Sequence, residues 1–447
     1  FTIGDTIVVE QLTNQLVMSD DAKALFGEKA LTKEGATPIT YDGEAEEMQK
    51  AEAEAFTVTA DDVEVSLEVP TVTEPSFREL PEDEPVHKFS EVQSGDISLE
   101  DFVAQMTEDE LITFLSGGNY RKDDGVGYSD DSGIPENFAS KASGVGGAGQ
   151  TRNIERFSIP SITFADGSAG IGYSAIPGVR DKNIGWPRAA AMACIWNKEL
   201  LREFAVEMGK AMLDINVDVW LAPSINLHRN PLGGRGNEYY SEDPILSGLV
   251  ASVVAEGVAE SGVTVCLKHF AGNDQEYYRR GVINDTTEQN GTSRDAINVI
   301  ATERTLREIY LKPFEMAVKT GKVMNVMSAF TKINGQYCAS NEGLLTDILR
   351  GEWGFQGFVV TDWGDYDVLA HEGHALAAGN DLNMPGGHSR YWITNKYRES
   401  LADGSLTLDQ MRRSAYRLLN TIQSSALSSM PEKQRSDLNI RRARSTR

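Results

Sequence analysis

Short apolar runs alternate with helical patterns from about Ser158 onward, and this alternation constrains the fold more than any other feature of the sequence. The apolar runs are SITFADG, VDVWLAPSIN, VTVCLKHFAG, KVMNVMSAF, GFVVTDW and DLNMPGG. Between them lie segments such as NKELLREFAVEMGKAMLD and SGLVASVVAEGVAESG, whose length and periodicity are typical of helices. Strands alternating with helices of this length predict βαβ units, a parallel sheet and right-handed crossovers.

The number of apolar runs bears on the type of α/β fold. Six runs fall short of the eight strands of a closed barrel. We expect a (β/α)8-like TIM barrel in which one or two units are irregular, and an open doubly wound sheet is the alternative. The chain of 447 residues is long enough to bury one such large core.

Domain boundaries follow from changes in composition. Residues 1–18 alternate apolar and polar side chains and are predicted to be the tail of an upstream β-sandwich module. Residues 19–95 carry few large apolar side chains and are predicted to be an acidic linker. The catalytic barrel is expected at 96–423, beginning with one amphipathic helix at 98–118, and 424–447 form a basic C-terminal tail.

The composition also limits the kind of partner. The formal net charge of −25 argues against nucleic acid or an anionic membrane and favours a neutral substrate. No run of about 18 continuous apolar residues is present, as a membrane-spanning helix would require. Three cysteines, Cys194, Cys266 and Cys338, are too few for a disulfide framework in so long a chain.

The chain opens on Phe1, and no signal-peptide pattern follows. We therefore expect a processed or truncated product that lacks domains upstream. A cytoplasmic location is slightly favoured, although the sequence does not fix it.

Five of the six apolar runs end in charged, aromatic or thioether side chains. These are Asp166; His228, Arg229 and Arg235; Lys268 and His269; Met327 and Phe330; and Asp362 and Trp363. A buried charge costs several kcal/mol unless it has a partner or lies in a solvated cleft. An ion-pair network that seals the barrel mouth would satisfy these charges, but a ligand cleft at the carboxyl ends of the strands is favoured.

Asp362 is the central candidate of this group. On its own stretch it is equally an N-cap of the following helical pattern or a catalytic carboxylate. Carboxylates, cations and an indole together suit a neutral polyhydroxylated ligand such as a sugar. We expect the neighbouring cations to lower the pKa of Asp362, so that it stays ionised as a nucleophile must.

Several segments, taken together, resemble glycoside hydrolase family 3 of the β-glucosidase type. They are ADGSAGIG, INLHRNPLGGRGNEYYSEDP, LKHFAGNDQEYYR, VMSAFTKINGQYCASN, LLTDILRGEWGFQGFVVTDWGD and LAAGNDLNMPGG. The resemblance runs from about Leu99 to Gln423 and implies a (β/α)8-like barrel accompanied by an α/β sandwich domain. GVGGAG at 144–149 resembles a glycine-rich loop over the sugar site of members in which the domain order is permuted and the barrel comes last.

The resemblance also implies roles for individual residues. Asp362 matches the catalytic nucleophile. The groups that hold the sugar hydroxyls match Asp166, Arg235, Lys268 and His269, and the walls of the sugar site match Met327 and Trp363. No cofactor and no metal is implied.

Three departures from the family pattern stand out. The usual DGPxGxR reads DGSAGIG here, and Phe330 stands where many members carry tyrosine. No barrel motif supplies the second carboxyl that a retaining glycosidase needs. The resemblance implies that this acid/base is a glutamate of the α/β sandwich, held in a missing domain or in a second chain.

The sequence therefore predicts a retaining exo-acting β-glycosidase, with a β-glucosidase favoured, that acts on the terminal sugar of an oligosaccharide or β-glycoside. A β-xylosidase or arabinosidase is the alternative within the same class. A non-catalytic carbohydrate-binding subunit also remains open, because the acid/base is absent from the chain.

Overall fold

A computed structural model of the chain describes most of residues 74–428. The described residues are 74–81, 83–117, 148–152, 154–171, 185–277, 279, 296–320, 322–364, 372–384, 390–426 and 428. The predicted upstream module at 1–18, residues 144–147 of the glycine-rich loop and nearly all of the C-terminal tail lie outside these ranges.

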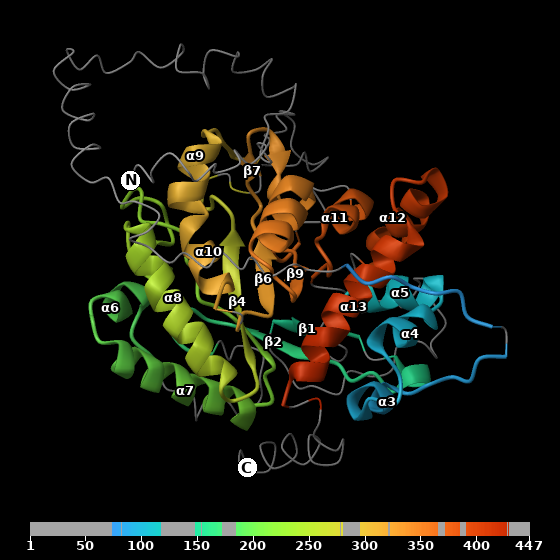
Figure 1. The fold of residues 1–447 in the computed structure, drawn as a ribbon. Coiled ribbons are helices and arrows are strands. Elements are labelled where there is room, and N and C mark those ends of the chain that lie inside the picture. Colours follow the sequence, from blue (N-terminus) through green and yellow to red (C-terminus); the bar gives the residue numbers. More distant parts are fainter. Residues whose placement is uncertain are drawn as a thin grey trace, which may run out of the picture.

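A six-stranded sheet forms the centre of the described structure (Figure 1). Its order is β1 (Gly149–Gln150), β2 (Thr163–Asp166), β3 (Val219–Leu221), β4 (Thr264–Phe270), β6 (Asn325–Ser328) and β9 (Phe358–Val360). Strands β2 to β9 are parallel, and only β1 runs antiparallel to its neighbour. Each of the first five predicted runs contains one parallel strand, while the sixth forms a single parallel bridge between Leu382 and Val360.

Helices connect the parallel strands, as the pattern predicts. Between β2 and β3 lie α6 (Ala189–Ala193) and α7 (Lys198–Asp214), and α8 (Pro244–Ala259) joins β3 to β4. The next crossover contains α9 (Glu303–Thr305), η5 (Leu306–Tyr310) and α10 (Lys312–Val318), and η7 (Gly343–Glu352) precedes β9. Local signals set these starts, since Asn197 caps α7 through the Leu200 amide and Asp243 caps α8 ahead of Pro244.

The remaining elements lie around this sheet. A small second sheet contains β5 (Asn298–Val299), β7 (Lys332–Ile333) and β8 (Gln336–Tyr337). After β9 come α11 (Glu372–Ala378), α12 (Arg390–Asp403) and α13 (Leu408–Ser424). Among the described residues, no helix combines the length and the apolar character needed to cross a membrane.

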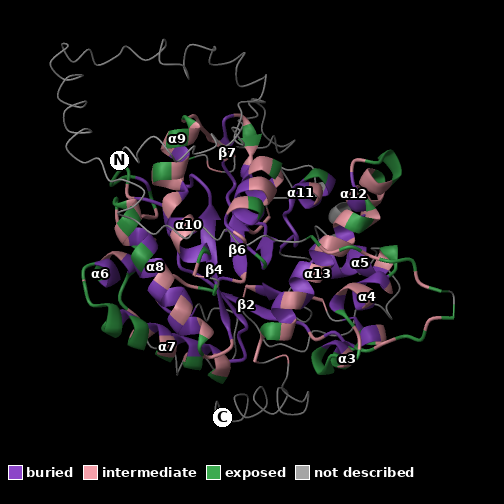
Figure 2. Cartoon of the chain, in the orientation of Figure 1, coloured by how far each residue is buried: buried purple, intermediate pink, exposed green. Residues whose placement is uncertain are grey.

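The two faces of the sheet are buried in different cores (Figure 2). Ala165 and Trp220 point to the side covered by α7, α8 and α10, while their neighbours Phe164 and Val219 point the other way, as the period of two requires. On that second side the rings of Phe164 in β2 and Phe358 in β9 meet edge to face, 6.1 Å apart. The first and last parallel strands thus face each other, so the sheet is curled as in a barrel and is not an open doubly wound sheet.

The region before the sheet differs from the prediction in two respects. Residues 98–118 do not form one helix: α4 (Leu99–Ala104) ends before α5 (Glu108–Leu115), because Thr107 and Glu110 form a capping box that starts a new helix. The range predicted as linker contains α3 (Phe89–Ser94), whose Phe89 is buried and lies 5.8 Å from the ring of Phe102. The predicted boundary at residue 96 therefore falls between two helices that pack together.

Candidate active site

A cavity of about 380 Å³ lies at the carboxyl ends of the parallel strands. Asp166 is the last residue of β2, Lys268 and His269 lie near the end of β4, and Asp362 follows β9 by two residues. The lining residues are Ala148, Asp166, Leu221, Arg235, Lys268, His269, Arg279, Met327, Phe330, Asp362 and Trp363. The cavity thus brings together the seven residues to which the resemblance assigns a role, at the edge where barrels of this kind hold their ligands.

The backbone around Asp362 is held by the segment 381–384. The amide of Thr361 donates to Leu382 O at 3.0 Å, and the amide of Gly364 donates to Met384 O at 3.0 Å. Further down the strand, the buried carboxylate of Asp381 accepts from the Val359 amide at 2.8 Å. Hydrogen bonds on both sides of Asp362 therefore fix its position at the end of β9.

The Asp362 carboxylate faces the cationic side of the cavity. Its Oδ2 lies 3.3 Å from Arg279 Nη1 and 3.7 Å from His269 Nε2, while Oδ1 accepts from the Trp363 amide at 2.6 Å. Burial raises the pKa of the Asp362 carboxyl above its ordinary value, although Arg279 and Lys268 act in the opposite direction. The expectation that cations lower this pKa is therefore wrong, because the loss of hydration in the cavity outweighs them.

His269 is almost completely buried and is held by its neighbours on three sides. Its amide donates to Asn226 Oδ1 at 2.8 Å, its Nδ1 lies 3.4 Å from the same oxygen, and its Nε2 lies 3.0 Å from Arg235 Nη1. Burial, together with the charges of Arg235 and Lys268, holds the pKa of His269 well below its ordinary value. The imidazole is neutral, so its contact with Asp362 is not an ion pair.

Asp166 and Lys268 form an ion pair at one side of the cavity. Lys268 Nζ lies 2.6 Å from Asp166 Oδ1, and the lysine is buried while the aspartate side chain is 62% exposed. Enclosure by the protein acts to raise the pKa of Asp166, but the charge and hydrogen bond of Lys268, the Gly167 amide and the charge of Arg235 together outweigh it, and the pKa lies below its ordinary value. Asp166 is therefore an anionic acceptor that is open to a ligand.

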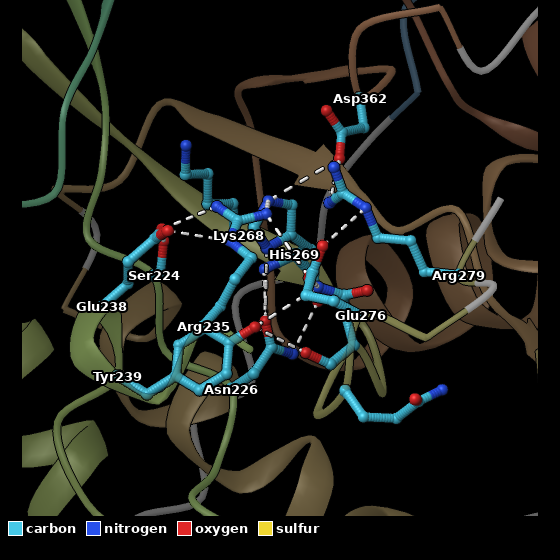
Figure 3. A network of polar contacts seen from close by, with 12 residues as sticks. Ser224, Asn226, Arg235, Glu238, Tyr239, Lys268, His269, Glu276, Arg279 and Asp362 are labelled. Atoms are coloured by element: carbon cyan, nitrogen blue, oxygen red, sulfur yellow. Dashed lines mark hydrogen bonds and ion pairs between the residues drawn. The ribbon is translucent and has the colours of Figure 1, made fainter. Parts of the chain in front are cut away.

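Two arginines and two glutamates form the other side of the site (Figure 3). Arg235 donates to both carboxylate oxygens of Glu238, at 2.9 and 2.6 Å. Arg279 Nε lies 2.9 Å from Glu276, whose other oxygen lies 3.8 Å from Arg235 Nη1. These ion pairs fix the direction of both guanidinium groups, because each has a carboxylate on its outer side.

The apolar part of the lining comes from Met327, Phe330 and Trp363. The indole Nε1 of Trp363 donates to Ala148 O at 2.7 Å, and its ring packs edge to face against Phe164 at 6.1 Å. Because the indole nitrogen is hydrogen-bonded to the Ala148 carbonyl, the ring plane is held in place and is available for an apolar sugar face.

The sequence prediction missed some residues of the site and included two that lie elsewhere. Arg279 lines the cavity, and Glu276 orients it, although both sit in a polar segment without periodicity. Their signal was the cluster of charged residues directly after the LKHF run. His228 and Arg229 were grouped with the strand-end residues, yet His228 contacts the carbonyls of the loop at 236–239 and Arg229 lies over the Tyr310 ring.

The described residues limit which groups can take part in chemistry. Among them, no three histidine, cysteine or acidic side chains are placed to hold a metal ion. The carboxylates that line the cavity within the described ranges are Asp166 and Asp362, and Asp166 is ion-paired. Of these two described carboxylates, Asp166 is largely exposed, whereas Asp362 is buried and lies 3.3 Å from Arg279.

A barrel-like α/β domain with such a site at its carboxyl edge is the architecture of many enzymes that act on small polar ligands. The chain belongs to glycosyl hydrolase family 3, since the pattern described as the Glycosyl hydrolase family 3 N terminal domain matches residues 146–421. The predicted family is confirmed, and the matched range contains all seven predicted site residues.

The named relatives include glycosidases of more than one specificity. The chain is 39% identical over 279 residues to thermostable beta-glucosidase B of Acetivibrio thermocellus. The aligned region covers 61% of this chain and 34% of that protein. It is 36% identical over 295 residues to an exo-alpha-(1->6)-L-arabinopyranosidase of Bifidobacterium longum, covering 64% and 36%.

A solved structure supports the same grouping. Beta-glucosidase 3B from Thermotoga neapolitana, in complex with glucose, superposes with a TM-score of 0.60 at 34% identity, covering 77% of this chain and 46% of that one. The chain spans about a third to a half of the length of the relatives it matches.

Proposed function

We propose that the protein to which this chain belongs is a retaining exo-acting β-glycosidase, with β-glucosidase as the favoured activity. The observation that carries the proposal is the position of Asp362, whose carboxylate is buried in the cavity with Oδ2 directed at Arg279. A nucleophile for an anomeric carbon needs such a fixed, desolvated carboxylate. The β-glucosidases among the relatives favour glucose as the sugar released.

The sugar is held by the groups around Asp362 in this proposal. Asp166 accepts hydrogen bonds from hydroxyls, and Lys268 and Arg235 donate to them. Trp363 and Met327 contact the apolar faces of the ring. A volume of about 380 Å³ is close to the lower end for ligand pockets, which suits a single terminal sugar.

The reaction proceeds in two displacements. Asp362 attacks the anomeric carbon, the bond to the leaving oxygen breaks, and a covalent glycosyl-enzyme forms. A second carboxyl about 5 to 5.5 Å from the nucleophile protonates the leaving oxygen and later takes a proton from the water that releases the sugar. Asp166 does not suit the first step, because its ion pair with Lys268 favours the charged form, and the same carboxyl must serve both steps.

From the resemblance to family 3, the acid/base is proposed to be a glutamate of an α/β sandwich domain, in the same polypeptide or in a second chain. The complete barrel is proposed to be (β/α)8-like with irregular units, since the described residues supply five parallel strands and one parallel bridge.

A pentosidase is the second candidate, because one relative is named an arabinopyranosidase. The two activities differ in whether the site contacts a hydroxymethyl group on the sugar. A series of inhibition constants for glucose, xylose and arabinose distinguishes them. Tightest binding of glucose supports the β-glucosidase assignment, and tighter binding of either pentose overturns it.

A trapping experiment tests the nucleophile separately from the acid/base. In 2,4-dinitrophenyl 2-deoxy-2-fluoro-β-glucoside the leaving group departs without a proton, and the fluorine slows release of the covalent sugar. Mass spectrometry of the digested chain is expected to find the fluoroglucosyl group on Asp362, and the Asp362→Asn variant should carry none. An adduct on another residue, or glucose binding without any adduct, would contradict the proposal, and the latter favours a non-catalytic binding subunit.

A further inference from the structure

The Arg279 guanidinium is held on three sides inside the cavity, and Figure 3 shows two of these contacts, with Glu276 and Asp362. Its carbon Cζ lies 4.8 Å from the centre of the Phe330 ring. Its Nε lies 2.9 Å from Glu276 Oε2, and its Nη1 lies 3.3 Å from Asp362 Oδ2. The flat guanidinium therefore packs on an aromatic face while one edge meets a supporting carboxylate and another meets the proposed nucleophile.

Four groups with basic side chains face Asp362, from three parts of the chain. Lys268 of β4 is ion-paired with Asp166 at 2.6 Å, and Arg235, from the loop after β3, is ion-paired with Glu238 at 2.6 Å. His269 of β4 is neutral for the reasons given above. Among the described residues, Arg279 is thus the cation that donates a hydrogen bond directly to the Asp362 carboxylate.

Glu276, which supports Arg279, is itself held in place by neighbouring groups. Its Oε1 accepts from Asn273 Nδ2 at 3.1 Å, and Asn273 is completely buried. Glu276 is also tied to the neighbouring loop, because its amide donates to Gly233 O at 2.9 Å. Two hydrogen bonds, one from the buried Asn273 side chain and one to the Gly233 carbonyl, therefore fix the residue that holds Arg279.

We propose that Phe330 and Glu276 are positioning residues that hold Arg279 against Asp362 and thereby keep the proposed nucleophile ionised during catalysis. This inference rests on the proposed function, since it assigns a task to groups around the same carboxylate. Phe330 provides a face without a hydroxyl, so it orients the guanidinium and leaves the hydrogen bond to Asp362 to Arg279.

The effect of losing this support follows from the balance at Asp362. Burial favours the protonated acid, and Arg279 is the nearest charge that favours the carboxylate. Without the ring, one of the contacts that fix the guanidinium is lost, its hydrogen bond to Asp362 weakens, and the acid form is then favoured up to a higher pH. The rate of covalent trapping should fall on the acid side, where a smaller share of Asp362 is ionised.

The experiment measures the trapping rate of the full chain against pH with the dinitrophenyl 2-fluoroglucoside. Phe330→Leu should move the acid limb of the profile upward by about 0.5 to 1 pH unit, which corresponds to a trapping rate about three- to tenfold lower on the acid side. The rate at high pH should change less. Phe355→Leu is the matched control, because Phe355 is equally buried and carries Arg350 5.2 Å from its ring centre, outside the cavity. Its acid limb should coincide with that of the wild type.

Glu276→Gln provides a second variant with almost unchanged shape. Removing a nearby negative charge would by itself move the acid limb downward, whereas loss of the Arg279 support moves it upward. An upward shift therefore supports the positioning role. A downward shift, or a Phe330→Leu profile lowered equally at every pH, overturns it. Absence of an Asp362 adduct in the wild-type chain would instead contradict the proposed function.

Discussion

The Nζ atom of Lys268 lies 2.6 Å from Oδ1 of Asp166, so one ion pair joins the carboxyl ends of β4 and β2 across the intervening strand β3. The two residues are 102 positions apart in the chain, and only the parallel order of the strands brings them together. Each fixes the other before a ligand arrives, which would lower the conformational cost of binding the proposed sugar.

Lys268→Met should weaken glucose binding about 10- to 100-fold, because a donor to the sugar is lost and Asp166 loses its partner. Isothermal titration with glucose gives the dissociation constant directly. Lys312→Met is the control, since Lys312 forms an ion pair with Glu315 on the outside of the barrel. An unchanged affinity in Lys268→Met would place the lysine outside the sugar site.

Asp362→Asn should lower turnover by at least about 10³-fold and also stabilise the fold at neutral pH. Because the folded-state pKa of Asp362 is raised, the wild type is most stabilised by this group at low pH and loses that contribution as pH rises through the raised value. The variant lacks the buried carboxylate, so its advantage in urea unfolding should be present at pH 8 and shrink as pH falls. An advantage that grows toward acid pH would contradict the raised pKa.

His269 should make the protein sensitive to acid. Its folded-state pKa is well below the ordinary value, so protonation of His269 favours the unfolded chain. The free energy of unfolding is therefore unaffected by this group above a pH of about 6.5 and decreases as pH falls toward the depressed value. His269→Gln should show a flatter dependence of the urea midpoint on pH between about 7 and 5. Equal slopes for wild type and variant would argue against a buried neutral imidazole.

Asp274 should have the opposite pH dependence. Burial raises its pKa to about 6, although its Oδ1 accepts from the Leu227 amide at 2.6 Å. The protonated form stabilises the fold, and this contribution is lost as pH rises through about 6. The free energy of unfolding of Asp274→Asn should therefore exceed that of the wild type by up to about 2 kcal/mol at pH 8. The difference should disappear near pH 4. Denaturant unfolding at the two pH values measures it.

Asp381 should be essential for the stability of the barrel edge. Its fully buried carboxylate lies 2.6 Å from Arg350 and 3.0 Å from Arg417. Asp381→Asn leaves the buried Arg350 guanidinium without this anion and leaves Arg417 with Glu74 as its remaining carboxylate, so it should cost about 3 to 5 kcal/mol in unfolding free energy.

Asp409→Asn is the matched control for that change. Asp409 pairs with Arg412 at 3.0 Å, but its side chain is 66% exposed, so the loss should be below about 1 kcal/mol. A similar small loss for Asp381→Asn would contradict the structural role of the buried network.

The strand-end residues could be predicted because two local rules apply to them. Apolar β-branched runs give strands, and parallel strands carry their carboxyl ends to one edge, so Asp166, Lys268 and Asp362 had to converge once the sheet was parallel. The same rules wrongly placed His228 with the strand-end residues. It lies in the loop after β3, where no strand constrains its position.

The order of strands and helices and the chemical groups at the strand ends can be predicted from the sequence, since both follow from periodicity and position along the chain. The behaviour of those groups depends on the folded structure. Arg279 is held in the cavity by the Phe330 ring and by Glu276, and the pKa of Asp362 is raised because burial outweighs the neighbouring cations. Desolvation and the distance between charges are properties of the folded molecule, and no local pattern encodes them.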